Sequence, residues 1–153
     1  MRASKIKEFI LILSIAIITA FIYNNLSASG IDYIYQSEKF SDDEILTVEQ
    51  TKEIFDSKTA VFIDARPMFS YSRGHIPGAL NVPYSSRTKE QLLKDVEKEE
   101  NIVVYCYSSR CNQARILATE LKKLDYKHVA VFNGGISEWQ KAGHPVETAK
   151  SES

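Results

Sequence analysis

"NIVVYCYSSRCNQARILATELKKLDY" occupies residues 101–126 and decides the fold. Residues 101–106 form an apolar, β-branched run, which is typical of a strand buried in a parallel sheet. Residues 113–126 repeat apolar side chains at helical spacing. The residues on that face are Ala114, Leu117, Ala118, Leu121 and Leu124. The stretch therefore predicts a buried strand, a short polar loop and an amphipathic helix, in that order.

The same alternation continues on both sides of this stretch. "AVFID" (residues 60–64) and "HVAVF" (residues 128–132) are short apolar runs that predict further buried strands. A helix containing Trp139 is expected after the second run, and Gly143 and Pro145 mark its end. Strands that alternate with helices over about 100 residues predict an α/β fold, a three-layer sandwich with a mainly parallel central sheet flanked by helices.

Two more helices are expected from their capping signals. Thr47 followed by Gln50 has the spacing of a capping box, so a helix should start at Thr47. "SRTKEQLLKDVEKEE" (residues 86–100) predicts a second helix capped by Thr88. Its inward side should carry Leu92, Leu93 and Val96.

Composition limits the chain to one domain and excludes one class of partner. With 153 residues, 44% hydrophobic and 25% charged, it fits a single globular domain with an appendage. The formal net charge is -1, and the basic residues are scattered among acidic ones. We therefore expect no nucleic-acid partner.

The first residues have the pattern of an export signal. Arg2, Lys5 and Lys7 precede the uncharged run "FILILSIAIITAFIY" (residues 9–23). Small residues near Ser29 suit cleavage there, so a cleaved signal peptide and an uncleaved signal anchor both fit; the uncleaved segment would contact the membrane through residues 6–23. Either interpretation predicts an extracytoplasmic location, periplasmic or in the cell envelope, where disulfides are permitted.

These features divide the chain into four parts. Residues 1–29 are the expected signal peptide or signal anchor, and residues 30–45 a linker or a segment packed on the domain surface. Residues 46–148 form the expected α/β domain, and residues 149–153 a C-terminal tail.

The loop between the strand of residues 101–106 and the helix of residues 113–126 contains the candidate catalytic residues. Cys106 stands at the carboxyl end of its strand, where open parallel sheets bind ligands. The following helix dipole, Arg110 and the amides of Tyr107 to Cys111 would all favour a thiolate there, which makes Cys106 a candidate nucleophile. Asp64 ends the neighbouring strand and is expected to approach the same edge, where it would orient loop amides or an arginine.

The two cysteines of the chain admit three interpretations: a disulfide, half of a metal site, or a nucleophile with a neighbour. The CxxxxC spacing is not the CxxC of zinc ribbons, and the three histidines show no ligand spacing, so no metal is expected. The loop residues Tyr107, Ser108, Ser109, Arg110 and Cys111 are polar and rich in donors, and the segment has no core character. That composition favours the nucleophile over a buried structural cysteine.

Three ordered motifs resemble those of the single-domain rhodaneses, a sulfurtransferase family. "FIDARPMFSYSRGHIPGALNVPY" is similar to the first family signature, and its Asp64 and Arg66 match the Asp-x-Arg element. "VVYC" and "VAVFNGGISEWQKAGHPV" are similar to the second and third. The resemblance covers about residues 46–147. It implies that Cys106 carries a sulfane sulfur as a persulfide, supported by Asp64 and Arg66, with no cofactor.

The active-site loop departs from the common family pattern at two positions. Members often have Cys-x-x-Gly-x-Arg, but this chain has Ser109 at the glycine and Cys111 at the arginine. The identity of the small sulfur donor, thiosulfate or a persulfide, and of the thiol or other thiophilic acceptor stays open. Related phosphatases with this fold need the motif Cys-x5-Arg. Counted from Cys106, the arginine position of that motif holds Asn112, which disfavours phosphate-ester hydrolysis.

Two other functions fit the same residues. Cys106 and Cys111 would serve a thiol–disulfide redox protein, because a loop disulfide is readily exchanged. A catalytically silent interaction module using the same fold is the other alternative.

Overall fold

A computed structural model describes residues 9, 12–15, 19, 39–41 and 44–148 of the chain. The strands of the domain are β1 (Ile45–Leu46), β2 (Val61–Asp64), β3 (Leu80–Asn81), β4 (Asn101–Tyr105) and β5 (His128–Phe132). Its helices are α2 (Val48–Ser57), α3 (Met68–Arg73), α4 (Lys89–Leu92), α5 (Gln113–Lys123) and α6 (Gly135–Lys141).

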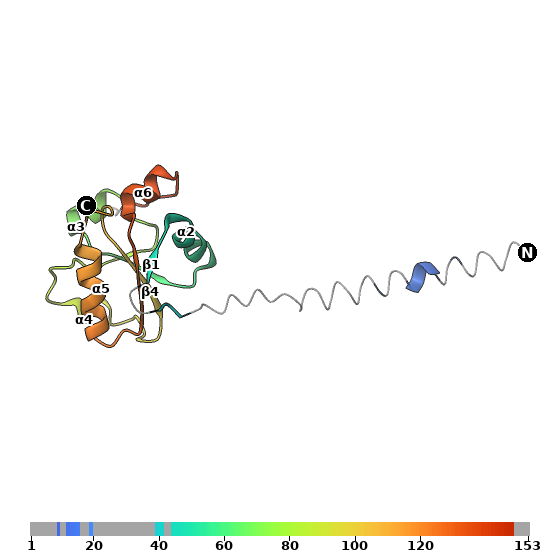
Figure 1. Cartoon of the computed structure of the whole chain (residues 1–153), viewed down its shortest axis with the longest axis horizontal. Coiled ribbons are helices and arrows are strands. Elements are labelled where there is room, and N and C mark those ends of the chain that lie inside the picture. Colours follow the sequence, from blue (N-terminus) through green and yellow to red (C-terminus); the bar gives the residue numbers. More distant parts are fainter. Residues whose placement is uncertain (1–8, 10–11, 16–18, 20–38, 42–43, 149–153) are drawn as a thin grey trace, which may run out of the picture. The chain divides into compact units, whose positions relative to one another are not determined.

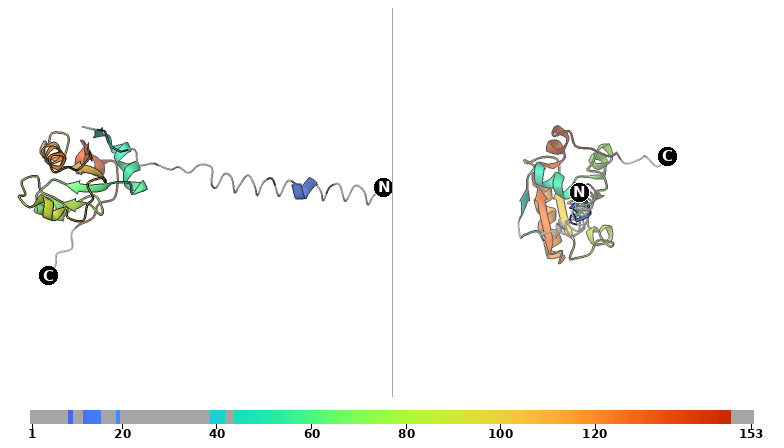
Figure 2. Two further views of the ribbon diagram at one scale, coloured as in Figure 1. Left: turned by 90° about the horizontal axis from the view of Figure 1, so that it is seen from below. Right: turned by 90° about the vertical axis from the view of Figure 1, so that its right-hand side faces the viewer.

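The strands form one parallel sheet in the order β1-β5-β4-β2-β3. β4 is central, pairing with β2 on one side and with β5 on the other. Figure 1 shows α4 and α5 on one side of the sheet and α2 on the other, and Figure 2 shows the same strands from two more directions. The predicted α/β sandwich with a parallel central sheet is confirmed.

All five residues of β4 are buried, and the side chains of residues 102–105 alternate between two hydrophobic clusters. Ile102 and Val104 join the cluster beneath α5, whereas Val103 and Tyr105 join the cluster beneath α2 and α6. Because side chains alternate along a strand, the next residue, Cys106, continues the row of Val104 on the α5 side. The sheet therefore aims Cys106 at the beginning of α5.

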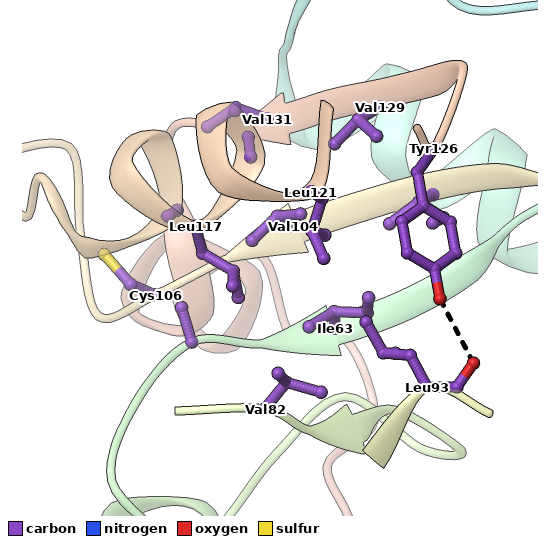
Figure 3. Packing of buried hydrophobic residues seen from close by; sticks show 14 of the residues in the cluster. Ile63, Val82, Leu93, Val104, Cys106, Leu117, Leu121, Tyr126, Val129 and Val131 are labelled. Carbon is purple, nitrogen blue, oxygen red and sulfur yellow. Dashed lines mark hydrogen bonds between the residues drawn. The ribbon is translucent and has the colours of Figure 1, made fainter. Parts of the chain in front are cut away.

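The cluster on the α5 side is drawn in Figure 3. Ile63, Val104 and Leu117 pack at its centre, and Cys106 lies at its edge, beyond the end of β4. The Tyr126 hydroxyl donates a hydrogen bond to the Leu93 carbonyl at 3.2 Å, so this buried hydroxyl is satisfied.

The cluster on the other side is organised by Trp139 of α6, which is fully buried. Its ring meets those of Phe55 and Phe132 edge to face, and its indole N–H donates to the Pro145 carbonyl at 2.7 Å. This packing fixes α6 against the sheet.

The capping box at Thr47 is confirmed, since Thr47 Oγ1 accepts from the Gln50 amide and the Gln50 side chain accepts from the Thr47 amide. The prediction of a helix over residues 86–100 is mostly wrong. α4 ends at Leu92, Thr88 makes no side-chain cap, and Leu92 is 45% exposed. The chain continues from Leu93 in turns, which bring Leu93 and Val96 to the core without a continuous helical face.

The N-terminal predictions fall mostly on residues that the structure does not describe. The signal peptide or anchor of residues 1–29 and the tail of residues 149–153 lie largely or wholly outside the described ranges. Among the residues that are described, no helix has the length and apolar character needed to cross a bilayer. A compact unit begins at Lys39, Phe40 packs on the Trp139 cluster, and Ile45 already pairs with β5, so contacts with the domain reach into the predicted linker.

Candidate active site

Cys106 follows β4 directly and is only 2% exposed. The Ala65 amide donates to the Tyr105 carbonyl at 2.9 Å, which extends the pairing of β2 with β4 up to the cysteine. Cys106 belongs to the cluster that includes Ala114 and Leu117. The expectation that the cysteine loop has no core character is therefore wrong for Cys106, because the alternation of β4 turns its side chain inward.

The loop after Cys106 is anchored by the start of α6. The Ile136 amide donates to the Cys106 carbonyl at 2.9 Å, and the Ser137 amide donates to the Tyr107 carbonyl at 3.0 Å. Gly135 makes this approach possible: it has φ +61°, and a Cβ there would lie 2.5 Å from the Cys106 oxygen. Two carbonyls of the loop are thereby committed to α6.

The amides of the loop are mostly left available. The Cys111 amide donates to the Ser108 carbonyl at 2.9 Å, so it is engaged in a turn and is not offered to a ligand, contrary to the expectation from the sequence. In the described part of the chain, the amides of residues 107–110 donate to no other group. The loop also contains no residue in the left-handed region, so Ser109 does not need the conformational freedom of glycine.

The structure joins Cys106 and Cys111 in a disulfide. Their Cα atoms are 6.4 Å apart, inside the usual range of about 4.4–6.8 Å for bridged cysteines. Cys111 is half-buried and packs on the same cluster as Cys106. Tyr107 is 62% exposed, and Ser109 and Arg110 are exposed as well, so the rest of the loop faces solvent.

Asp64 and Arg66 form a buried ion pair beside this loop. Asp64 ends β2 opposite Tyr105, and its carboxylate accepts from the Arg66 amide, from Nε and, at 2.6 Å, from Nη2. Arg66 Nη2 also donates to the Gly74 carbonyl at 2.7 Å. Asp64 thus orients an arginine, and in the described residues its side chain makes no hydrogen bond to an amide of the cysteine loop.

Asp64 helps to keep both Arg66 and Tyr105 protonated at this end of the sheet. Burial opposes the charge of Arg66, but the hydrogen bonds and charge of Asp64 outweigh it and raise the pKa of the guanidinium. Burial and the Asp64 carboxylate raise the pKa of the Tyr105 hydroxyl well above its ordinary value, so the phenol stays protonated. Its oxygen accepts from the Ile76 amide at 3.0 Å.

A pocket of about 330 Å³ opens next to the cysteine loop. Its lining residues are Arg66, Ser70, Arg73, Gly74, Tyr107, Ile136 and Gln140. Arg73 lies over the Phe69 ring at 5.6 Å from its centroid, and no carboxylate of the described residues pairs with it. Unlike Arg66, Arg73 therefore offers an uncompensated positive charge.

Arg73, Gln140 and the anchoring amides of α6 were not predicted from the sequence. Arg73 comes from α3, and its place in the pocket depends on how that helix turns back over the sheet. A larger pocket of about 800 Å³, lined in part by Val61, Phe62 and Leu80, lies where β2 and β3 begin. It is at the opposite end of the sheet from Cys106, so we assign it no part in the chemistry.

These features define a class of α/β proteins in which a cysteine loop joins the central strand of a parallel sheet to the next helix. The Rhodanese-like domain family matches residues 47–142, and the chain belongs to this family. The family resemblance expected from the sequence is confirmed.

Several known proteins are similar to this chain in amino-acid sequence. The chain is 33% identical to 3-mercaptopyruvate sulfurtransferase from Escherichia coli over 128 residues, which covers 73% of this chain and 45% of that protein. It is 34% identical over 92 residues to an HTH-type transcriptional regulator from Mycobacterium tuberculosis, covering 56% of this chain and 36% of the regulator. The chain thus spans half or less of the length of these relatives.

A crystal structure of a Bacillus halodurans protein has the same fold, with a TM-score of 0.64 and 26% identity. The match covers 69% of this chain and 77% of that one.

The contact between Gly135 and the cysteine loop can be tested with a matched pair of substitutions. Gly135→Ala should both destabilise the fold and greatly reduce the reactivity of Cys106, because the new methyl group displaces the Cys106 and Tyr107 backbone. Gly78→Ala is the control, since Gly78 has φ +74° but a methyl group added there would meet nothing within 4 Å. In both variants the free energy of unfolding should fall by about 1–2 kcal/mol, because alanine is forced into the left-handed backbone conformation.

The measurements are the free energy of unfolding in urea and the rate of thiol alkylation of the reduced chain. Equal alkylation rates in the two variants would show that α6 does not position Cys106.

Proposed function

We propose that the protein is a sulfurtransferase that carries sulfane sulfur as a persulfide on Cys106. The observation that carries the proposal is the placement of Cys106, at the end of the central strand and in a loop whose amides at residues 107–110 are unengaged. Family membership and the sulfurtransferase relative support the same reaction class.

The reaction proceeds in two displacements once both cysteines are reduced. The Cys106 thiolate attacks the sulfane sulfur of the donor, and the rest of the donor leaves with the electron pair of the broken bond. A thiol or another thiophile then attacks the outer sulfur of the persulfide, and the electron pair returns to Cys106. In the disulfide form Cys106 Sγ lies 3.3 Å from the Cys111 carbonyl oxygen. The proposal therefore requires that, after reduction, the amides of residues 107–110 and the dipole of α5 face the sulfur and stabilise its negative charge in both states. The proposed steps need no metal or organic cofactor.

The pocket beside the loop favours an anionic donor. Tyr107 lines this pocket together with Arg66 and Arg73, so a donor held there lies next to the cysteine loop. The charge of Arg66 is balanced by Asp64, which leaves Arg73 to attract an anion. Thiosulfate and an anionic low-molecular-weight persulfide both carry the negative charge that this arrangement selects.

A thiol–disulfide redox protein is the second candidate, and the Cys106–Cys111 disulfide is the observation that favours it. A redox protein would exchange this bond with thiols and would need no sulfur donor. The two functions differ in one measurable species, the persulfide.

The persulfide on Cys106 is the first test. Full-length reduced Cys111→Ser treated with thiosulfate or with a small persulfide should gain the mass of one sulfur atom. The wild type should show the same gain at least transiently, and Cys106→Ser should gain none. Intact-protein mass spectrometry measures the gain, and cyanide should remove it as thiocyanate. If no donor produces the added sulfur on Cys106 in either the wild type or Cys111→Ser, the proposal fails.

The role of Arg73 is tested by Arg73→Gln. Removing an exposed charge that attracts the donor should raise KM for thiosulfate about 3- to 10-fold with a much smaller change in kcat, as expected for lost ground-state binding. Arg87→Gln, an exposed arginine outside this pocket, is the control. A KM for Arg73→Gln equal to that of Arg87→Gln would exclude Arg73 from donor binding.

We also propose that the domain works outside the cytoplasm, either released after cleavage near Ser29 or anchored through residues 6–23. The support is the basic, then apolar, pattern of the first residues. N-terminal sequencing of the chain from membrane and soluble fractions should find either Gly30 as the first residue or the intact start in the membrane fraction. Recovery of an uncleaved chain in the cytoplasm would contradict the proposal.

A further inference from the structure

Cys111 occupies an unusual place in the loop. It lies at the last position before the Asn112 cap of α5, and its half-buried side chain turns back onto the cluster that holds Cys106. The turn closed by the Cys111 amide and the Ser108 carbonyl produces this reversal. The second thiol is therefore presented to the first by the backbone of the loop.

Cys111 has direct access to Cys106. With the disulfide formed, Cys106 is only 2% exposed. The side chain of Cys111 does reach Sγ, since the structure joins the two sulfurs directly. Attack on the inner sulfur of a Cys106 persulfide is thus available to Cys111.

The frame around Cys106 is held independently of the disulfide. β4 pairing, together with the hydrogen bond from the Ile136 amide, fixes its backbone, and neither contact involves Cys111. Formation and reduction of the bond therefore need no rearrangement of the strand that carries Cys106.

Resting on the proposed function, we propose that Cys111 is a resolving thiol that converts the Cys106 persulfide into free sulfide. The Cys111 thiolate attacks Cys106 Sγ and forms the disulfide, while the bond from Sγ to the outer sulfur breaks. The outer sulfur leaves with that electron pair and a proton as hydrosulfide. It is reduced by two electrons, which come from the two cysteine thiols.

A dithiol reductant must complete each cycle. It reduces the Cys106–Cys111 disulfide by thiol–disulfide exchange and is itself oxidised to a disulfide. The sum is reduction of one donor sulfane sulfur to sulfide by one dithiol. Resolution competes with transfer to an external thiophile, and a tethered thiol is favoured in this competition by its high effective concentration.

A single-turnover experiment on the full-length chain tests the resolving step. The reduced, desalted protein is mixed with one equivalent of a low-molecular-weight persulfide or thiosulfate, with no other thiol present, and sampled for sulfide and for intact mass. The wild type should release about one equivalent of sulfide and finish as the disulfide. Cys111→Ser should keep the added sulfur at least about tenfold longer and release little sulfide.

Controls separate the resolving step from the persulfide itself. Cys111→Ala guards against a specific effect of the serine hydroxyl, and Thr119→Ala on the exposed side of α5 should behave like the wild type. Equal persulfide lifetimes in the wild type and both Cys111 variants would overturn the resolving role and leave the sulfurtransferase proposal standing. If neither Cys111 variant acquires the added sulfur, the proposed function fails and the resolving step fails with it.

Discussion

The central position of β4 is the constraint on which the rest of the site depends. Because β4 pairs on both sides and buries both faces, it cannot shift, and its alternation determines which way Cys106 points. Sliding the strand by one residue would turn Cys106 toward the Trp139 cluster and Tyr105 toward α5. The polar loop beyond it can then vary in sequence, as it does at Ser109 and Cys111, without changing the location of Cys106.

Two neighbouring elements complete the site in different ways. α6 holds the loop through backbone groups, which explains why Gly135 matters although it contributes no side chain. The segment after β2 contributes side chains: Asp64 fixes Arg66, and α3 brings Arg73 to the pocket. The first element sets the geometry of the cysteine, whereas the second sets the charge that lines the neighbouring pocket.

Much of this arrangement could be predicted from sequence, because burial patterns and family motifs are local. The parallel sheet, the capping box at Thr47 and the place of Cys106 after a buried strand all followed from short stretches. The burial of Cys106, the α6 anchors and the position of Arg73 could not, since each depends on how distant segments meet. The short α4 escaped prediction for a related reason, because Leu93 and Val96 reach the core through turns whose pattern resembles that of a helix.

The hydrogen bonds from Ile136 and Ser137 have a consequence for the order of events during synthesis. The groups that hold the cysteine loop lie near the C-terminal end of the domain, about 30 residues after Cys106 in the sequence. During synthesis, both cysteines are therefore made well before the α6 amides that anchor their loop. The cysteine loop therefore reaches its final structure only when the domain is complete. Until then, both cysteines lack the contacts with α6 that hold the loop.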